Sequence, residues 1–480
     1  MSKRVLLCIL LLTLTGCMTV GPDYKRPAID TPAAWRFEEK EVRDLANTAW
    51  WQQFKDPVLD RLVSQALQEN KNLLIATARI EEFFGRYFST RGEQFPSAGG
   101  NAQAFRQRLT EKGFIPVGDR DNPYNQYEAF LNGSWEIDFW GKFRRATEAA
   151  RAELLGTEES RRTVVLTLVS AVAAAYVDIR ALDKQLEITQ RTADSRKSTL
   201  ELLQLRFQNG IISEVDVNQA ESEYEDALAR LPDIERAIGQ AENALSVLLG
   251  RNPGPIPRGL PLDALILPAV PAGVPSELLE RRPDIRRAEQ LLIAANARIG
   301  VAKSLYFPTI SLTGAFGTVS TDLSNLFTAS SKAWNFGVPV SVPLFTAGRI
   351  GGEVRANEAV QQQALYSYQQ TIQNAFREVD DALLDRSKSG QRLEAMSRQL
   401  KALRNYDRLA RIRYDEGYTS YLEVLDADRS LFNVELTHTA TQNVLFRSLI
   451  NIYKSMGGGW VDQAEQGMPT QPAMEAGFIP

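Results

Sequence analysis

The sequence lacks most of the side chains used in metal and nucleophilic chemistry. Its only two cysteines, Cys8 and Cys17, lie near the N-terminus, so the rest of the chain can form neither a disulfide framework nor a cysteine metal site. The single histidine, His438, excludes a multi-histidine metal site within one chain. A formal net charge of −4 argues against nucleic acid as a partner. We therefore expect no metal and no cofactor, although carboxylate chemistry remains possible.

Residues 1–16 are typical of a lipoprotein signal peptide. Two basic residues precede an apolar run from Val5 to Leu14, which is too short to cross a bilayer as a mature helix. The run ends in Leu14-Thr15-Gly16-Cys17, the pattern of a lipobox, which predicts an acylated Cys17 held in membrane lipid. Met18, where Asp would favour inner-membrane retention, indicates the outer membrane. The alternative is a soluble exported protein with a chance cysteine.

The mature chain contains two copies of one structural unit. Placing residue n beside n+207 aligns Arg206–Gly210 with Arg413–Gly417, and Gly250 with Gly457. Farther upstream the offset becomes 212. The mature chain is thus divided into a lipidated strap (17–56), a first repeat (57–250), a linker (251–275), a second repeat (276–457) and a C-terminal tail (458–480), flexible from residue 461.

Each repeat is expected to contain an opening helix, two strands, a long helix, a turn and a returning helix. The opening helices are predicted at 58–90 and 276–304, and the strands near 99–110, 126–138, 309–320 and 333–345. Heptad spacing of apolar residues predicts a first long helix over 141–208, roughly 100 Å in length at 1.5 Å per residue. The apolar segment Val164–Val177 lies in this seam and is expected to be core.

The turn after each long helix is marked by a glycine and a serine. Gly210 and Gly417 suit the left-handed conformation that follows a helix. Ser420 forms the S-x-x-E capping-box pattern with Glu423 and should cap the returning helix, and Ser213 with Asp216 is a weaker version. Each long helix therefore folds back on itself as a hairpin.

Six motifs in a specific order and spacing cover nearly the whole mature chain. They are Gly21-Pro22-Asp23-Tyr24, Trp50 to Leu59, Arg281-Arg282-Pro283-Asp284-Ile285, Phe345-Thr346-Ala347-Gly348-Arg349, Leu425 to Ser430 and Tyr453 to Trp460. Together they resemble the TolC-like outer membrane efflux family, in particular its lipoprotein branch. Four strands cannot close a barrel, whereas three chains supply twelve.

The resemblance implies a mainly α-helical chain with a membrane β-barrel. Its homotrimer would form a 12-stranded β-barrel in the outer membrane and a long periplasmic α-helical barrel. It would be a non-enzymatic export channel that passes drugs or other small toxic molecules. The implied partners are a periplasmic adaptor protein and an inner-membrane transporter of the RND type.

The resemblance also assigns two groups of site residues. In related lipoprotein channels, residues matching Leu422, Asp426 and Arg429 form the periplasmic constriction, or gate. Their spacing places all three on one helix face, and the first repeat has Val215, Gln219 and Ser222 instead. An ordinary solvated helix face is the alternative. The expected adaptor contacts at the tip are Arg206, Gly210, Ser213, Arg413, Gly417 and Ser420.

Three other functions remain open at this point. A periplasmic coiled-coil lipoprotein without a pore could use the same helical seams. A carboxylate enzyme such as a glycosidase would need two converging carboxylates, and the repeat pattern singles out no such pair. A type I secretion duct for proteins shares the expected architecture. The sequence identifies neither the cargo nor the cognate pump.

Overall fold

The computed structural model describes residues 19–37, 49–112, 121–270, 275–457 and 460–466. The predicted lipidation site, Cys17, lies outside the described residues. The chain divides into two compact units, each built from both repeats. The first unit comprises Met1–Ala28, Ile80–Thr157 and Ala288–Tyr368, and the second comprises Ile29–Arg79, Glu158–Arg287 and Gln369–Pro480.

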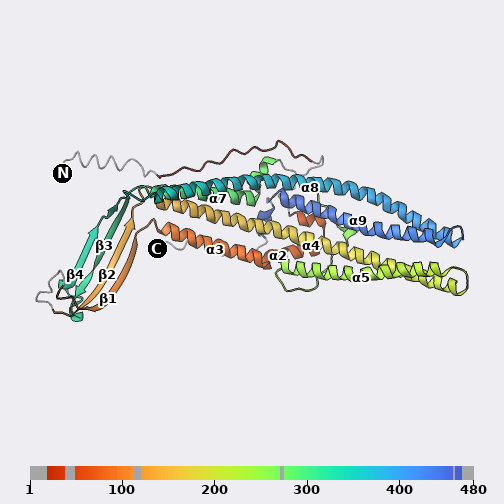
Figure 1. Cartoon of the computed structure of the whole chain (residues 1–480), viewed down its shortest axis with the longest axis horizontal. Coiled ribbons are helices and arrows are strands. Elements are labelled where there is room, and N and C mark those ends of the chain that lie inside the picture. Colours follow the sequence, from red (N-terminus) through yellow and green to blue (C-terminus); the bar gives the residue numbers. More distant parts are fainter. Residues whose placement is uncertain (1–18, 38–48, 113–120, 271–274, 458–459, 467–480) are drawn as a thin grey trace. The chain divides into compact units, whose positions relative to one another are not determined.

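The first unit contains one antiparallel sheet with the strand order β1-β2-β3-β4 (Figure 1). Its strands are β1 (Ser97–Gln107), β2 (Tyr124–Glu136), β3 (Thr309–Ser320) and β4 (Lys332–Gly337), and the short β5 (Val340–Ser341) pairs with β3. The four predicted strands are confirmed, except that the last one is interrupted. Pro339 separates β4 from β5 because proline has no N–H to donate to a ladder.

The two faces of this sheet differ in polarity. Leu131, Phe316 and Trp334 lie directly opposite one another on successive strands, so they form one cross-strand row. Their exposed fractions are 68%, 58% and 65%. Glu128 is three residues from Leu131 in β2, so its side chain lies on the opposite face of the sheet. There it accepts a hydrogen bond from the Gln103 side-chain amide at 2.5 Å. An apolar face backed by a polar one is the pattern of a membrane barrel strand.

The sheet also ends in two open edges within one chain. β1 and β4 each pair with one neighbouring strand only, so their outer N–H and C=O groups have no strand partner among the described residues. Such edges pair with other strands or close into a barrel. The arrangement is that of one segment of a larger closed sheet.

The strap residues 19–28 are anchored to the helical part of the first unit. A Cβ on Gly21 would overlap the backbone of Gly300, so only glycine allows this close approach. Asp23 pairs with the buried Arg145 at 2.6 Å, and the Tyr24 hydroxyl donates to Glu289 at 3.0 Å. The Gly21-Pro22-Asp23-Tyr24 motif therefore fastens the strap.

The second unit is helical. It contains α2 (Pro57–Glu69), α5 (Glu214–Leu248), α6 (Leu278–Arg281), α9 (Tyr421–Ser455) and α10 (Val461–Gln466). Four helices extend across the division between the units: α3 (Lys71–Gly92), α4 (Lys142–Gln208), α7 (Pro283–Ser304) and α8 (Arg349–Asp415). The predicted bounds of the first long helix are confirmed to within one residue. In Figure 1, α4 folds back into α5 and α8 folds back into α9.

Both predicted opening helices are interrupted. Asn70 has an extended backbone between α2 and α3, and its side-chain amide donates to the Leu248 carbonyl at 2.8 Å. Its side-chain oxygen accepts from the N–H of Leu73, which satisfies a free donor at the new helix start. In the second repeat, Arg282 is extended before Pro283, because a residue before proline disfavours the helical conformation.

The core of the second unit includes a cluster of aromatic residues that the tail completes. Trp50 stacks on Tyr453 with ring centroids 5.2 Å apart, and Trp460 contacts Trp50 edge-on at 6.0 Å. Val461 and Ala464 of α10 are also buried. The prediction of a flexible tail is therefore wrong for residues 461–466, because their apolar side chains cover this cluster. Residues 467–480 lie outside the described part.

One stretch of α4 is long and apolar enough, by composition, to cross a membrane, and 67% of it is buried inside the protein. Buried residues of α4 include Val165, Val169, Val172 and Tyr176, which belong to the core of the second unit. The expectation that Val164–Val177 is core is confirmed.

Candidate functional site

The two helix–helix turns have the same backbone design. The N–H of Ile211 bonds the Arg206 carbonyl at 3.0 Å, and the N–H of Gly210 bonds the Phe207 carbonyl at 2.8 Å. The second turn repeats both bonds, from Tyr418 to Arg413 and from Gly417 to Tyr414. This pair of bonds is the Schellman motif, which requires the left-handed residue that Gly210 (φ 70°) and Gly417 (φ 76°) supply.

The capping residues differ from the prediction. Ser213 has the complete capping box: its hydroxyl accepts from the Val215 N–H at 3.2 Å, and its own N–H bonds Asp216. Ser420, expected to be the stronger cap, makes no side-chain cap bond. Glu423, the other residue of the expected capping box, instead accepts from the Thr419 hydroxyl and pairs with Arg413 at 3.3 Å.

The predicted tip residues lie on these two turns and their flanking helix ends. Arg206 lies 5.4 Å from the centre of the Tyr414 ring, a cation–π contact between the first and second hairpins. Its guanidinium is also 3.9 Å from Asp415. The most exposed apolar side chains of the turns are Ile211 at 70% and Tyr418 at 77%. An exposed apolar residue beside an arginine on each turn makes a surface suited to a protein partner.

The three predicted gate residues occupy the outward face of α9 just after the second turn. Leu422, Asp426 and Arg429 are exposed, whereas Tyr421, Val424, Leu425 and Ala427 between them are buried. Leu422 retains an exposed fraction of 59%, which is high for a leucine. The shared face is therefore confirmed.

Asp426 and Arg429 have different partners from one another. The Tyr406 hydroxyl of α8 donates to the Asp426 carboxylate at 3.2 Å. Arg429 donates instead to Glu223 of α5, with N···O distances of 2.6 and 2.5 Å. That hydrogen bond is the main reason why the pKa of Arg429 is raised. Within one chain Arg429 thus bonds the first repeat through Glu223, and not the neighbouring Asp426.

A network of ion pairs lies beneath the gate face. Arg196 of α4 has a side chain only 5% exposed, and it pairs with Glu223 at 3.0 Å and with Asp428 at 2.8 Å. Asp428 also receives Arg411 of α8 at 2.9 Å, and Arg411 pairs with Asp407. A buried charge needs such partners, and losing one leaves the others unpaired. The only sequence sign of this network is Arg196 itself, a polar interruption of the heptad seam.

A second set of ion pairs repeats this pattern farther from the turns. Arg191 of α4 and Arg404 of α8 both donate to Glu435 of α9, at 2.5 and 3.1 Å. Glu435 is seven residues from Asp428, and Arg404 is seven from Arg411. Because seven residues are about two helical turns, the two sets lie on the same faces of α8 and α9. They connect α9 to both long helices.

The described residues include no group of three or more metal-ligating side chains. Residues 62–251 and 274–458 match the outer membrane efflux protein family, in two segments that fit two repeats. The chain belongs to the outer membrane efflux protein family. The resemblance carried by the six motifs is therefore confirmed.

Sequence relatives and a solved structure agree with this assignment. The chain is 38% identical over 458 residues to the solvent efflux pump outer membrane protein SrpC of Pseudomonas putida, covering 94% of this chain and 97% of the relative. It is 35% identical over 455 residues to the cation efflux system protein CusC of Escherichia coli O157:H7, covering 94% and 97%. The open-state structure of the Neisseria gonorrhoeae MtrE outer membrane channel is similar, with a TM-score of 0.84, 31% identity, and 92% and 98% of the two chains covered.

These relationships establish the architecture that the sequence predicted. The protein is an outer-membrane export channel of an efflux pump, with three chains forming a 12-stranded β-barrel and a periplasmic helical barrel. The open edges of β1 and β4 are thereby explained, since each pairs with a neighbouring chain in the closed barrel. Efflux pumps of this kind join the channel to an adaptor and to an inner-membrane component.

Proposed function

We propose that the channel is closed by three copies of Leu422, Asp426 and Arg429 around the threefold axis. The observation that carries this proposal is the exposed, unburied face that these three residues share on α9. Three Leu422 side chains would form an apolar collar. Three Asp426 carboxylates would form an acidic ring, which passes cations more readily than anions.

The bond between Arg429 and Glu223 gives the closed state an energetic basis. It joins the returning helices of the two repeats at the level of the gate. Since Glu223 is also held by Arg196, displacing α9 outward would break bonds in which both partners are charged. Opening then requires α9 to separate from α5, and an adaptor bound at the turns is placed to bring this about. Because MtrE has an open-state structure, a closed-to-open transition in this fold is reasonable.

We assign adaptor contact to the two turns, through Arg206, Gly210, Ser213, Arg413, Gly417 and Ser420. The glycines supply the left-handed backbone of the two turns, and the space around each is open, since a Cβ on either would meet no atom within 4 Å. The neighbouring Ile211 and Tyr418 would supply the apolar contact area.

The remaining assignments concern the cargo, the anchor and the pump. We propose small toxic molecules as cargo, since the relatives SrpC and CusC are named for solvent and cation efflux respectively. We further propose that Cys17 is acylated and that the inner-membrane partner is an RND transporter.

Thiol cross-linking tests the gate directly. If the Asp426 side chains converge, trimers of Asp426→Cys treated with a short bismaleimide should give covalent dimers and lose export. Gln219→Cys is the matched control, because Gln219 is the first-repeat counterpart of Asp426 and should remain uncrosslinked. Equal cross-linking of the two variants, or none in either, would place the gate elsewhere.

A further inference from the structure

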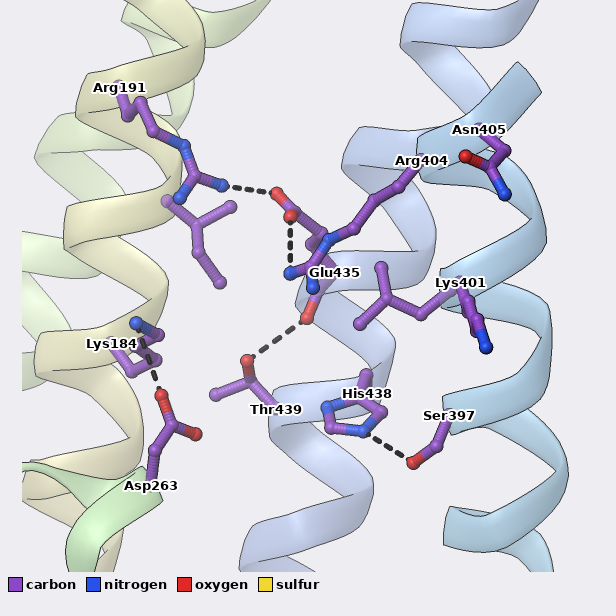
Figure 2. Close-up of a pocket in the computed structure, with 12 residues that line it drawn as sticks. Lys184, Arg191, Asp263, Ser397, Lys401, Arg404, Asn405, Glu435, His438 and Thr439 are labelled. Carbon is purple, nitrogen blue, oxygen red and sulfur yellow. Dashed lines mark hydrogen bonds and ion pairs between the residues drawn. The ribbon is translucent and has the colours of Figure 1, made fainter. Parts of the chain in front are cut away.

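A cavity of about 530 Å³ lies beside the second set of ion pairs, in which Arg191 and Arg404 bond Glu435 (Figure 2). It is bordered by α4, α8, α9 and the short turn η2 (Leu262–Ala264), all in the second unit. Its lining includes the buried apolar side chains of Ile188 and Leu400, and its other lining residues are polar or charged. No residue of the proposed gate or of the turns borders it.

The charges around this cavity are unbalanced. Four cationic side chains border it, Lys184, Arg191, Lys401 and Arg404, against the two carboxylates of Asp263 and Glu435. The local formal charge is therefore +2 with His438 neutral, whereas the whole chain carries −4. An excess of positive charge around a cavity with low-dielectric walls concentrates anions there.

Several donors at the cavity have bonding capacity left. Arg191 and Arg404 point toward Glu435 in Figure 2, and each gives it a single nitrogen. A guanidinium has five N–H donors, so most of theirs remain available. Within the described part of the chain, the Lys401 ammonium and the Asn405 amide have no ion-pair or hydrogen-bond partner. Lys184, in contrast, is occupied by Asp263 and Glu187.

A neighbouring cavity shows that this excess is specific to one place. It shares Arg191, Arg404 and Glu435 with the first cavity and adds Arg411, Asp407 and Asp428. Three cations there face three carboxylates, so its formal charge is zero. Arg191 and Arg404 thus border one neutral cavity and one cationic cavity. Only the cationic cavity has positive charge left for a ligand.

We propose that the cavity at Lys401, Arg404 and Arg191 is a binding site for a small oxyanion with at least two negative charges. Two such charges would neutralise the local excess. The spare N–H groups of the arginines suit the paired oxygens of a carboxylate or a phosphate. The volume accommodates a molecule of the size of citrate or pyrophosphate rather than a polymer. The Ser397 hydroxyl, next to His438 at 3.0 Å, adds a polar group for orientation. This site is independent of the proposed gate.

The test is calorimetric titration of the purified trimer with pyrophosphate and with citrate, using glycerol as the uncharged comparison. Saturable binding of one oxyanion per chain is expected, and glycerol should give none. Lys401→Gln should lower the affinity about tenfold or more, since a hydrogen bond between charged groups is lost. Because Lys401 has no partner in the described part, this variant should fold as the wild type does, which thermal unfolding verifies.

Arg236→Gln is the matched control. It also removes one exposed positive charge from the second unit, but Arg236 pairs with Asp233 on α5 and does not border the cavity. The affinity of the Arg236→Gln variant for the oxyanion should equal that of the wild type. An equal loss of oxyanion affinity in Lys401→Gln and Arg236→Gln would show diffuse electrostatic attraction and overturn the site. The site would also be overturned if neither pyrophosphate nor citrate gave a saturable heat of binding. Binding of pyrophosphate alone, or of citrate alone, sensitive to Lys401, would support the site and identify which oxyanion it takes.

Discussion

The guanidinium of Arg429 lies 2.5 Å from the carboxylate of Glu223, which joins the second repeat to the first at the level of the gate face. The pair is asymmetric, because the repeat counterparts of Arg429 and Glu223 are Ser222 and Ser430, which cannot form an ion pair. The ion pair therefore rests on positions at which the two repeats have different residues. In the proposed gate, closure therefore depends on a difference between the two repeats.

Glu223→Gln should favour the open channel. The side chain of Arg429 is 49% exposed, so solvent weakens the lost bond to about 1 kcal/mol per chain. Over three chains the loss sums to about 3 kcal/mol, which would raise the ratio of open to closed channels in planar bilayers by roughly a hundredfold. Glu221→Gln is the control, since Glu221 is exposed on the same helix. An open probability unchanged in Glu223→Gln would show that this pair does not hold the closed state.

Two glycines with the same backbone conformation should respond differently to alanine. Gly210→Ala should cost about 1 kcal/mol, because its φ of 70° is strained for alanine but the space around it is open. Gly250→Ala has the same strain, and its Cβ would also overlap the backbone of Glu69. Thermal unfolding of the two variants should therefore show the larger loss for Gly250→Ala. Similar losses would mean that the α2 end can move away freely.

Asp56 should be essential to the stability of the second unit. Its carboxylate is fully buried and accepts from the Val58 N–H, the Leu260 N–H and the Tyr176 hydroxyl at 2.9, 2.9 and 2.6 Å. Asp56→Ala leaves three buried donors unpaired and should cost about 3 kcal/mol or more. Tyr176→Phe removes one of the three bonds, together with the acceptor of the Gly259 N–H, and should cost about 1–2 kcal/mol. Denaturant unfolding measures both, and a loss no greater for Asp56→Ala than for Tyr176→Phe would contradict this account.

His438 should make stability depend on pH below the normal histidine range. Burial, with the nearby Arg404, lowers the pKa of His438 below 6.5 despite the opposing carboxylates of Asp263 and Glu435. The folded state therefore favours the neutral ring. The contribution of the neutral His438 ring to the stability of the folded state is complete above pH 6.5. It is lost as the pH falls through the lower pKa of His438 in the folded protein.

His438→Gln is the variant that isolates this effect. It should remove the part of the decline in melting temperature that the histidine causes, while other groups continue to titrate. The charged groups that border the same cavity are Lys184 of α4, Asp263 of η2, Lys401 and Arg404 of α8, and Arg191 and Glu435. Parallel melting curves for His438→Gln and wild type across this pH range would show that the ring titrates equally in the folded and unfolded chains.

Local sequence signals predicted most of the helices and strands. The heptad seam and the glycine after it fixed α4 and its turn, because helix periodicity and left-handed termination depend on nearby residues. The breaks at Asn70 and Arg282 were missed. Asn70 is held by the Leu248 carbonyl and Arg282 by the Ser455 carbonyl, and both partners are more than 170 residues away.

The candidate site was predicted only in part for the same reason. Spacing alone placed Leu422, Asp426 and Arg429 on one helix face, which the structure confirms. The partner of Arg429 could not be predicted, because Glu223 belongs to another helix and resembles any other glutamate in a polar helix. The tail helix was missed because its burial depends on the aromatic cluster around Trp50.

The measurement that tests the gate most directly is the conductance of inserted trimers in a planar bilayer, comparing wild type with Asp426→Ala/Arg429→Ala. The wild type should show a small or rare conductance, because the acidic ring and the Arg429–Glu223 bond keep α9 closed. The double variant removes both and should conduct clearly more. Equal conductance in the two proteins, with trimers of both fully inserted, would contradict a gate formed by these residues.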